Sequence, residues 1–495
     1  MTHTRVEHPI WRVVSPRRQR RWRRILAPPL VVLGVVYGLF FVDALLYVSE
    51  PHFDLPRLQP GSVEERAALW RDPPYGRGDR AFRWGMSDNG DQETGSSTDQ
   101  VRTLPSWLPL YEDLGVDLVR LFPGWRYFQP AGPGALDTRY HVHALIEGFT
   151  AAGFQIEASP WNAPVWGVTG GPWRFWGPNV SQFMPPKDWD DPDGPYCTWL
   201  EELHHEYPAI SVWQIWNEPD YPSGDLRPVW NPLVFRFWRG SAQRYGELVA
   251  ACTEQIHRWG EGALVATGGV SMPTYLDAVL AVANATDVDV LDMHFAAGTG
   301  RPDPDVQLDR LLRQAHEQLG VAAGRGMQHP RLSVSELSFA YSPEGADAQA
   351  DFVAKAYATA VGLGWDNLAW YMINPLRNYW DTGLVDFGVD GRPGPERPAY
   401  WAYRFNKAVL GRATALGLSG DGTDVRSVDF TTDDGRPVFA AWSPSGRGET
   451  VMWPVDAGPG VVYDHLGNKV ADTAPGASVE LATTIRYVVP ADWIH

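Results

Sequence analysis

The sequence predicts an α/β protein whose largest part is a (β/α)8 barrel, the TIM-barrel fold, over residues 80–412. Three observations support this fold class. Short apolar runs of β-forming residues alternate with helical patterns, which is the rhythm of a barrel of parallel strands. Several runs end in a polar or charged residue, as barrel strands do where they open into a shared pocket. No G-x-G-x-x-G turn follows the first run, which disfavours the alternative, a doubly wound open sheet.

Eight runs have the length and the β-branched or aromatic content of barrel strands. We expect strands at Phe82–Ser87, Val116–Phe122, Phe154–Ser159, Ser211–Trp216, Leu264–Gly269, Val288–Phe295, Leu332–Leu337 and Asn367–Ile373. The segments between them follow a helical periodicity. We expect helices at His141–Ala152, Pro186–Glu206, Phe237–Trp259, Tyr275–Asn284, Val306–Leu319 and Ala346–Gly362, and a last barrel helix at Arg397–Leu410.

The fourth run, which begins at Ser211, has the clearest strand end. Apolar β-formers continue to Trp216, and Pro219 cannot donate a hydrogen bond to a sheet ladder, so the strand must stop before it. Glu218 therefore lies at the carboxyl end of a buried strand, where a parallel barrel places its catalytic groups. Taken alone, the same residue could be an acid that enters a solvated loop.

The amino-terminal 48 residues are typical of a membrane anchor. Residues 1–24 hold eight arginines and one glutamate, and residues 25–48 form an apolar run long enough to cross a bilayer. Because basic residues stay on the cytoplasmic side, we expect a cytoplasmic tail, a single transmembrane helix in the cell membrane, and an extracytoplasmic catalytic domain after a linker over residues 49–79. A cleaved signal peptide is the competing interpretation, and the long basic leader without an A-x-A-like site disfavours it.

The formal net charge of −17 restricts the partners of the protein. Residues 1–24 carry +7, so the remainder carries about −24, which argues against nucleic acid as a partner. The two cysteines, Cys197 and Cys252, allow either one disulfide or two free thiols. No HExxH, CxxC or phosphate-binding loop is present, so we expect neither a metal nor another cofactor. The oligomeric state is left open.

Residues 413–495 have a different sequence pattern from the barrel. Short runs of alternating apolar and polar residues are separated by turns rich in Gly, Pro and Asp. This pattern predicts a small antiparallel β domain, which we interpret as a sandwich. The expected strands are Asp424–Phe430, Pro437–Trp442, Thr450–Val455, Gly460–Tyr463 and Thr484–Val489.

The carboxyl ends of the expected barrel strands bring a small set of residues to one pocket. Two of them, Glu218 and Glu336, would stand on opposite sides of the barrel mouth. Such a pair suits cleavage of a glycosidic bond, because one carboxyl group protonates the leaving oxygen while the other attacks or activates water. Alone, Glu336 could instead be a rim acid in a salt bridge with Arg120. The full set is Ser87, Arg120, Ser159, Asn217, Glu218, His294, Glu336 and Trp370.

These motifs resemble clan A of the retaining glycoside hydrolases. Trp216-Asn-Glu-Pro219 matches the clan's strand-four signature, and Ser335-Glu-Leu337 occupies the place of its strand-seven nucleophile. Arg120, Trp125 and Gln129-Pro130 together resemble the strand-two pattern of the β-xylosidase and α-iduronidase family (family 39) and of related cellulase-like barrels. Four further segments resemble motifs of the same group, so the resemblance covers roughly residues 80–410. They are Pro186-Lys-Asp-Trp189, Gln349-Ala350, Gly383-Leu-Val-Asp386 and Arg397-Pro-Ala-Tyr400.

The resemblance implies a role for each matched residue. Glu218 would be the general acid/base and Glu336 the nucleophile, with carboxyl groups about 5–5.5 Å apart, and the charge of Glu336 should raise the pKa of Glu218. Asn217 would bind the sugar 2-hydroxyl, and Arg120 would keep Glu336 ionised. Since neighbouring strand residues face opposite ways, Asn217 and Glu218 can share a pocket only if the strand breaks there. His294 matches the strand-six histidine.

Aromatic residues are the expected platforms for sugar rings. Trp370 would stack beneath the sugar at the point of cleavage, and Trp125 and Trp161 would line the substrate groove, although a core position is the alternative for each. Some relatives place a tyrosine two residues after the strand-six histidine, where this chain has Ala296. Tyr341 or Tyr371 would then have to replace it.

The expected function is therefore that of a membrane-anchored retaining glycoside hydrolase acting on an extracellular or cell-envelope polysaccharide or oligosaccharide. A catalytically silent barrel that only binds glycan is one alternative, and a transglycosylase that uses the same residues is another. The sequence specifies neither the sugar nor whether attack is internal or at chain ends.

Overall fold

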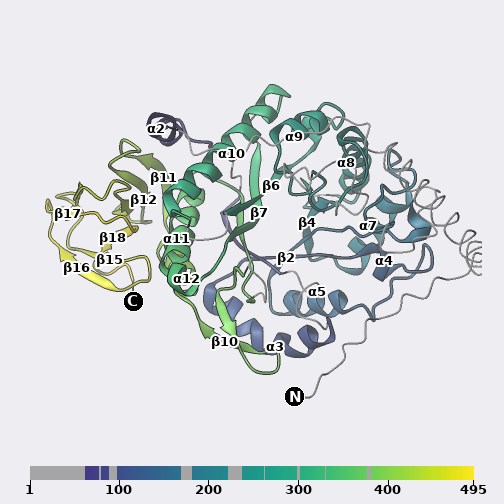
Figure 1. The fold of residues 1–495 in the computed structure, drawn as a ribbon, viewed down its shortest axis with the longest axis horizontal. Helices are drawn as coiled ribbons and strands as arrows, with labels where there is room; N and C mark the ends of the chain where they lie inside the picture. Colours follow the sequence, from purple (N-terminus) through teal and green to yellow (C-terminus); the bar gives the residue numbers. More distant parts are fainter. Residues whose placement is uncertain are drawn as a thin grey trace, which may run out of the picture. The chain divides into compact units, whose positions relative to one another are not determined.

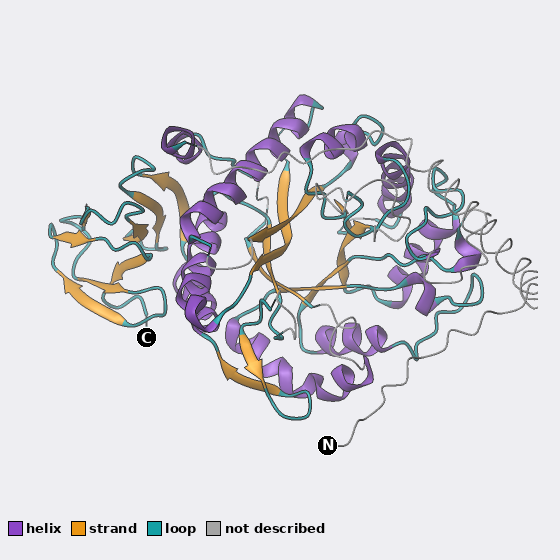
Figure 2. Ribbon diagram, viewed as in Figure 1, coloured by secondary structure: helices purple, strands orange, loops and turns teal. Residues whose placement is uncertain are grey.

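The computed structural model describes residues 62–76, 78, 80–88, 97–168, 181–220, 237–260, 262–297, 302–328, 330–375 and 381–494, with the backbone alone at 97–103. Its centre is a closed barrel of eight parallel strands in the order β1 to β8, which confirms the predicted fold class (Figures 1 and 2). Each expected strand overlaps an observed one. The observed bounds are β1 Arg83–Ser87, β2 Leu118–Leu121, β3 Gln155–Ala158, β4 Ile210–Ile215, β5 Leu264–Thr267, β6 Val290–Ala297, β7 Arg331–Phe339 and β8 Asn367–Tyr371.

Helices cover the outer face of the barrel, so the strands are buried on both faces (Figure 2). They include α3 Ser97–Leu114, α4 Trp125–Phe128, α5 His141–Ala151, α7 Pro195–Glu206, α8 Ala242–His257, α9 Pro273–Leu280, α10 Pro304–Gly324, α11 Ala346–Gly362 and α12 Pro398–Leu410.

Two helices begin later than their periodicity predicted. The helix expected from Pro186 begins at Pro195, because the acidic segment before it forms turns in which Gly194 donates its N–H to the carbonyl of Asp191. The helix expected from Phe237 begins after Ser241, whose hydroxyl accepts the N–H of Arg244 and caps it.

The two cysteines form a disulfide, which decides between the alternatives that the sequence left open. Cys197 on α7 is bonded to Cys252 on α8, with their Cα atoms 5.1 Å apart. The bond ties the helix before β4 to the helix after it.

A short helix, α2 (Val63–Arg71), lies within the segment expected to be a linker. Ser62 and Glu65 form a capping box at its start. The buried Trp70 donates its indole N–H to the carbonyl of Ser419, and Arg66 pairs with the buried Asp309 of α10. The helix is therefore docked on the folded body.

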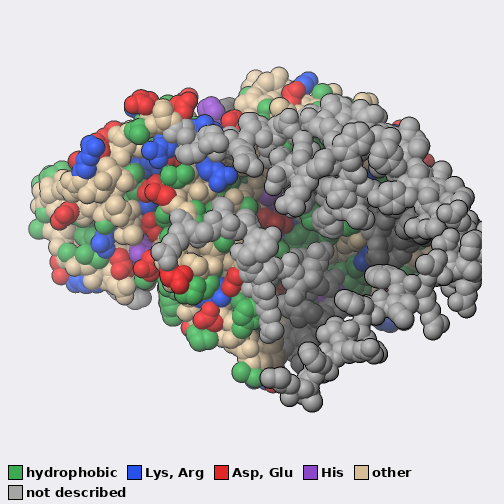
Figure 3. All heavy atoms as spheres, in the orientation of Figure 1, with side chains coloured by type: hydrophobic (Ala, Val, Ile, Leu, Met, Phe, Trp, Pro, Cys, Tyr) green, Lys and Arg blue, Asp and Glu red, His purple; other side chains and the backbone are tan. Residues whose placement is uncertain are grey.

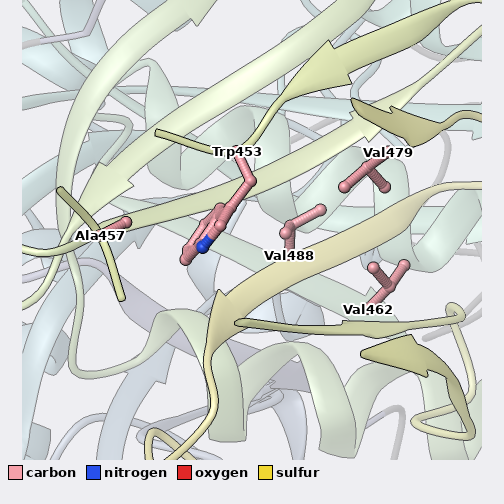
Figure 4. Close-up of a cluster of buried hydrophobic side chains, with 5 residues drawn as sticks. All are labelled: Trp453, Ala457, Val462, Val479 and Val488. Carbon is pink, nitrogen blue, oxygen red and sulfur yellow. The ribbon is translucent and has the colours of Figure 1, made fainter. Parts of the chain in front are cut away.

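The carboxyl-terminal region contains the expected antiparallel sheet, with six strands in the order β11-β12-β13-β18-β15-β16, and a separate pair, β14 and β17. Figure 4 shows the cluster that joins the two sheets, in which Trp453 and Val479 pack with Val462 and Val488. The strands β11, β16 and β17, and the hairpin β9–β10 after the barrel, were not expected. The bounds are β9 Val385–Phe387, β10 Pro393–Glu396, β11 Thr414–Ser419, β12 Arg426–Thr431, β13 Pro437–Trp442, β14 Thr450–Met452, β15 Gly460–Tyr463, β16 Lys469–Thr473, β17 Ser478–Glu480 and β18 Arg486–Pro490.

The expected basic tail and transmembrane helix, residues 1–24 and 25–48, lie outside the described residues. Among the residues that are described, no helix has the length and apolar character needed to cross a bilayer. On the described surface visible in Figure 3, acidic and basic side chains are interspersed rather than gathered by sign.

Candidate active site

The strand β4 breaks directly before the predicted acid. Trp216 and Glu218 have φ angles of 69° and 43°, a region that residues other than glycine adopt rarely and only when their surroundings hold them there. The N–H of Glu218 donates to the carbonyl of Gly268 at 2.7 Å, and Ser159 donates its hydroxyl to the carbonyl of Trp216 at 3.1 Å. This break lets Asn217 and Glu218 both face the barrel mouth.

Asp220 fixes the loop that follows. Its Oδ2 accepts the backbone N–H groups of Ser271 and Met272, at 2.8 and 2.7 Å, and so joins the ends of β4 and β5. Burial raises the pKa of Asp220 to about 7. A role for Asp220 was not predicted from the sequence.

Arg120 at the end of β2 is the hub of the cluster, and its side chain is fully buried. It donates to Oε1 of Glu336 at 2.5 Å and to Oδ1 of Asn217 at 2.8 Å, so the predicted pairing with Glu336 is observed. A guanidinium offers five N–H donors in a rigid fork, which is why one residue can orient so many acceptors. Its other partners are Oε1 of Gln214, the hydroxyls of Ser87 and Ser159, and Nε2 of His294, which lies 3.4 Å from Nη2.

His294 reaches the cluster because of a β-bulge. Met293 pairs with Val334 and His294 pairs with Glu336, which leaves Ser335 as the extra residue of β7. Nδ1 of His294 lies 2.7 Å from Oε1 of Glu218, and Nε2 lies 3.1 Å from Oγ of Ser335. Burial lowers the pKa of His294 to about 3, so the ring is neutral in the ordinary pH range.

The two predicted acids meet at the mouth of the barrel. A carboxylate oxygen of Glu218 and one of Glu336 lie within 4.8 Å of each other, and about a fifth of each side chain is exposed. Burial raises the pKa of Glu218 to about 7, while Arg120 opposes the rise. The predicted direction is confirmed, but its main cause is burial rather than the charge of Glu336. One carboxyl group that holds a proton near neutral pH thus faces a second one that is paired with a guanidinium.

Glu218, His294 and Glu336 are also close enough to share a metal ion. Their contacts argue against that use. Glu336 is engaged by the positive charge of Arg120, which would repel a cation, and Nδ1 of His294 is hydrogen-bonded to Glu218. The cluster therefore fits acid–base chemistry better than metal binding.

The predicted aromatic platforms are buried. Trp125 and Trp370 are 0% exposed and Trp161 is 3% exposed. Trp370 donates its indole N–H to the carbonyl of Thr382, and Trp125 stacks on Trp199. These contacts are those of core residues, and the sugar-stacking roles stay predictions. Tyr341, considered as a contact of the nucleophile, lies under the guanidinium of Arg397 at 3.7 Å.

Several buried polar residues on the barrel strands were not predicted from the sequence. Three of them contact one another: Gln214 on β4, Asp292 on β6 and Ser335 on β7. Oδ1 of Asp292 accepts the backbone N–H of Ser335, and Gln214 donates through Nε2 to both Asp292 and Ser335. A polar residue inside an apolar strand was the available signal, because burying one requires partners.

A surface groove of about 440 Å³ lies elsewhere, between α7 and α8. None of the strand-end residues lines it, so we do not place the chemistry there. Its lining residues are Asp193, Glu201, His204, His205, Gln255, Arg258 and Trp259.

Comparisons with known proteins agree with this fold. Comparison with family models gave no match, and neither did comparison with curated proteins. Among solved structures, the chain is similar to a family 39 glycoside hydrolase from the gut symbiont Bacteroides cellulosilyticus WH2, with a TM-score of 0.58 and 17% identity over 82% of this chain and 80% of that chain.

Two further solved structures are similar over most of their length. A family 30 endoxylanase from Clostridium papyrosolvens C71 has a TM-score of 0.55 and 16% identity, over 84% of this chain and 97% of that one. A family 39 β-xylosidase from Caulobacter crescentus has a TM-score of 0.54 and 15% identity, over 83% and 96%. At such identities the likeness concerns the fold, and for the fold it confirms the resemblance to clan A barrels.

Proposed function

We propose that this protein is a retaining glycoside hydrolase that uses Glu336 as nucleophile and Glu218 as general acid/base. The observation that carries the proposal is the pair of carboxyl groups at the barrel mouth, with oxygens within 4.8 Å of each other. Retaining enzymes hold these groups about 5–5.5 Å apart, whereas inverting enzymes need about 6.5–9.5 Å to admit a water molecule. The short separation favours direct attack on the sugar.

The environments of the two acids suit opposite roles. Glu336 accepts a hydrogen bond from the buried guanidinium of Arg120, which orients the carboxyl group that would attack the sugar. Glu218, whose burial raises its pKa to about 7, retains a proton that it can give to the leaving oxygen. In the second step the ionised Glu218 takes a proton from the water that releases the sugar from Glu336.

Asn217 is placed to bind the substrate beside them. Because Arg120 only donates, the Asn217 atom that faces it must be the amide oxygen, at 2.8 Å. The amide nitrogen is thereby turned away from Arg120 and can donate to a sugar 2-hydroxyl. Such a bond strengthens in the transition state.

We further propose that the protein is held in the cell membrane by residues 25–48, with the barrel outside the cytoplasm, and acts on a polysaccharide or oligosaccharide there. The basic leader and apolar run support the anchor, and the Cys197–Cys252 disulfide supports the oxidising side. A catalytically silent barrel that only binds glycan is disfavoured, because both Glu218 and Glu336 are present. Glu218 is hydrogen-bonded to His294, and Glu336 to Arg120. A transglycosylase would share the first step and differ in its acceptor.

Labelling tests the proposal directly. A panel of 2-fluoro glycosides with activated leaving groups should trap a covalent glycosyl adduct on Glu336, located by peptide mass spectrometry. Glu336→Gln is the control that should remain unlabelled. If no sugar of the panel labels the wild-type protein, while a glycan array shows binding, the silent barrel is the better description. Products formed in the presence of an added sugar acceptor separate hydrolysis from transglycosylation.

A further inference from the structure

A chain of four hydrogen-bonded side chains runs from the barrel mouth into the interior. Oε1 of Glu218 lies 2.7 Å from Nδ1 of His294, and Nε2 of the same ring lies 3.1 Å from Oγ of Ser335. That hydroxyl lies 2.8 Å from Oδ2 of Asp292. Glu218 keeps a partly exposed side chain, whereas the other three residues are buried. The chain links a group at the mouth to an interior carboxyl group that the mechanism above does not use.

We propose that this chain is a proton wire, in which Glu218 and Asp292 share one proton through His294 and Ser335. The inference rests on the proposed function, because a retaining hydrolase needs Glu218 protonated in one step and ionised in the next. Asp292 and Ser335 are positioning residues in this scheme. They act on Glu218 through the imidazole and do not touch the substrate.

Two arrangements of the same proton satisfy every member of the wire. In the first, Glu218 is protonated and donates to Nδ1 of His294, Nε2–H donates to Ser335, and the hydroxyl donates to ionised Asp292. In the second, protonated Asp292 donates to Ser335, the hydroxyl donates to Nε2, and Nδ1–H donates to ionised Glu218. Passing from one to the other breaks the O–H bond of Glu218, the N–H bond at Nε2 and the O–H bond of Ser335. It forms an N–H bond at Nδ1, a new O–H bond on Ser335 and the O–H bond of Asp292, so protons and charge balance and the ring stays neutral.

Gln214 supports both arrangements. Arg120 donates from Nε to Oε1 of Gln214 at 2.6 Å, which turns the amide nitrogen toward Ser335 at 2.7 Å and toward Asp292. A serine hydroxyl has one hydrogen and two acceptor sites. In either arrangement Ser335 accepts from Gln214 and from one neighbour, and donates to the other. Neither state leaves the hydroxyl of Ser335 short of a partner, and the nitrogen of Arg120 that lies 3.4 Å from Nε2 of His294 favours the state in which Nε2 accepts.

Both ends of the wire hold a proton more readily than an exposed carboxyl group does. Burial raises the pKa of Asp292 well above its usual range, and the nearby Glu157 raises it further, while Arg120 lowers it. At the other end, burial raises the pKa of Glu218 and Arg120 opposes the rise. The titratable and charged groups that face the wire from neighbouring elements are Arg120, Glu157, Asp220, Tyr245 and Glu336.

The consequence for catalysis concerns the supply of the proton to Glu218. In the first arrangement the proton is on Glu218, where the leaving oxygen can take it, and in the second it is held in reserve on Asp292. When Glu218 gives the proton to the leaving oxygen, Nε2–H still donates to Ser335 and the ring stays neutral. Glu218 regains a proton from the water of the second step.

Nitrogen-15 NMR of the full-length protein labelled at histidine tests the wire without substrate, with the His294 signals assigned from His294→Gln. While the wire holds its one proton, we expect a neutral ring whose two nitrogens report a mixture of the Nε2–H and Nδ1–H tautomers, because the two arrangements carry the same number of protons. A single tautomer would overturn the proposal. So would protonation of the ring in place of the exchange.

Matched variants connect the exchange to turnover. Asp292→Asn and Ser335→Ala should each freeze the tautomer and move the alkaline limb of kcat/KM to lower pH by about one unit, because Glu218 loses the groups that favour its proton. Ser333→Ala is the control, since Ser333 is a buried hydroxyl on the same strand that contacts Asn367 rather than the wire. It should change neither quantity. If the alkaline limb of kcat/KM moved equally in Ser333→Ala and Ser335→Ala, the effect of Ser335 would come from packing and not from the wire.

The outcomes separate the wire from the proposed function. Tautomer exchange in a protein that no 2-fluoro glycoside labels would overturn the hydrolase proposal and the catalytic use of the wire. Labelling of Glu336 without exchange would overturn the wire and leave the hydrolase standing. Circular dichroism on each variant shows whether a negative result reflects misfolding, and the wild-type spectrum needs no variant beyond the assignment.

Discussion

A fully buried guanidinium, that of Arg120, donates at 2.5 Å to Glu336, a carboxylate that keeps 17% of its side-chain surface exposed. The partner that balances the charge of Glu336 thus comes from inside the barrel. The exposed part of the carboxylate lies on the side away from Arg120, where the proposed sugar substrate would approach it.

Arg120→Lys should abolish most activity although it keeps the positive charge. A lysine offers one ammonium group in place of a five-donor fork, so it cannot serve Glu336, Asn217 and Gln214 together. Losing one partner of a buried pair costs about 3–5 kcal/mol when the other is left uncompensated, and lysine should recover only part of this. We expect kcat/KM to fall at least about 100-fold, with a lower melting temperature.

Arg139→Lys is the control for that experiment. Arg139 also pairs with a carboxylate, Asp137, but its side chain is 89% exposed. Exposed pairs contribute little, so neither activity nor stability should change measurably. If kcat/KM and the melting temperature fell equally in the two variants, Arg120 would not be the residue that organises the site.

Glu218→Ala should slow substrates with poor leaving groups far more than activated aryl glycosides. Only a poor leaving group needs the proton that Glu218 would supply in the proposed mechanism, and general acid catalysis contributes about 10²- to 10⁴-fold. The comparison is made by measuring kcat/KM over a leaving-group series. Glu336→Ala should reduce all members alike, because every substrate needs the nucleophile. A uniform loss in Glu218→Ala would exclude the acid role.

The raised pKa of Glu218 also predicts a cost in stability. In the unfolded chain this carboxyl group titrates near 4.5, whereas in the folded protein it titrates near 7. Between these values the unfolded state releases a proton that the folded state retains, so the contribution of Glu218 to stability falls as the pH rises from about 4.5 to 7 and is constant above.

Glu218→Gln should therefore stabilise the protein at pH 8 and not at pH 4.5. We expect a gain on the order of 2 kcal/mol at pH 8, reduced from the full linkage value because part of the side chain meets solvent. Denaturant unfolding at the two pH values measures it. An equal effect of the substitution at both would contradict the assignment of the raised pKa to Glu218.

Removal of the disulfide should destabilise the barrel without altering its chemistry. Cys197 and Cys252 are 55 residues apart in sequence, and closing a loop of this size in the unfolded chain is worth about 2–4 kcal/mol. The double variant Cys197→Ser, Cys252→Ser should unfold at lower denaturant concentration and keep its kcat at low temperature. Wild type with reductant should behave like the variant. A large loss of kcat in a folded double variant would mean that the bond also positions the site.

The barrel could be predicted because each of its strands is a short apolar run between recognisable turns. The ends of these strands then identified Arg120, Glu218, His294 and Glu336, since the fold dictates where strand ends meet. The exposed strand Lys469–Thr473 could not be found in this way, because four of its five residues face solvent and it lacks alternation. The helix α2 was missed for a similar reason, as it buries only Ala67 and Trp70.

The interior of the site was beyond prediction for a different reason. Strand periodicity says which residues are buried, but not which buried polar atoms meet across the barrel. The contact between Ser335 and His294 depends on a one-residue bulge, and a shift of one residue reverses the direction of every side chain beyond it. The orientation of Asn217 likewise depends on the positive φ angles of Trp216 and Glu218, which cannot be predicted from the conformational preferences of these residue types.

The docking of α2 bears on the proposed membrane anchor. Fourteen residues, 49–62, connect the end of the proposed anchor at residue 48 to the start of α2 at Val63, and a chain of that length spans at most about 50 Å even when fully extended. In the proposed arrangement α2 therefore stays within about 50 Å of the end of the anchor. Glycans that are attached to the cell are the substrates that such a protein would meet first.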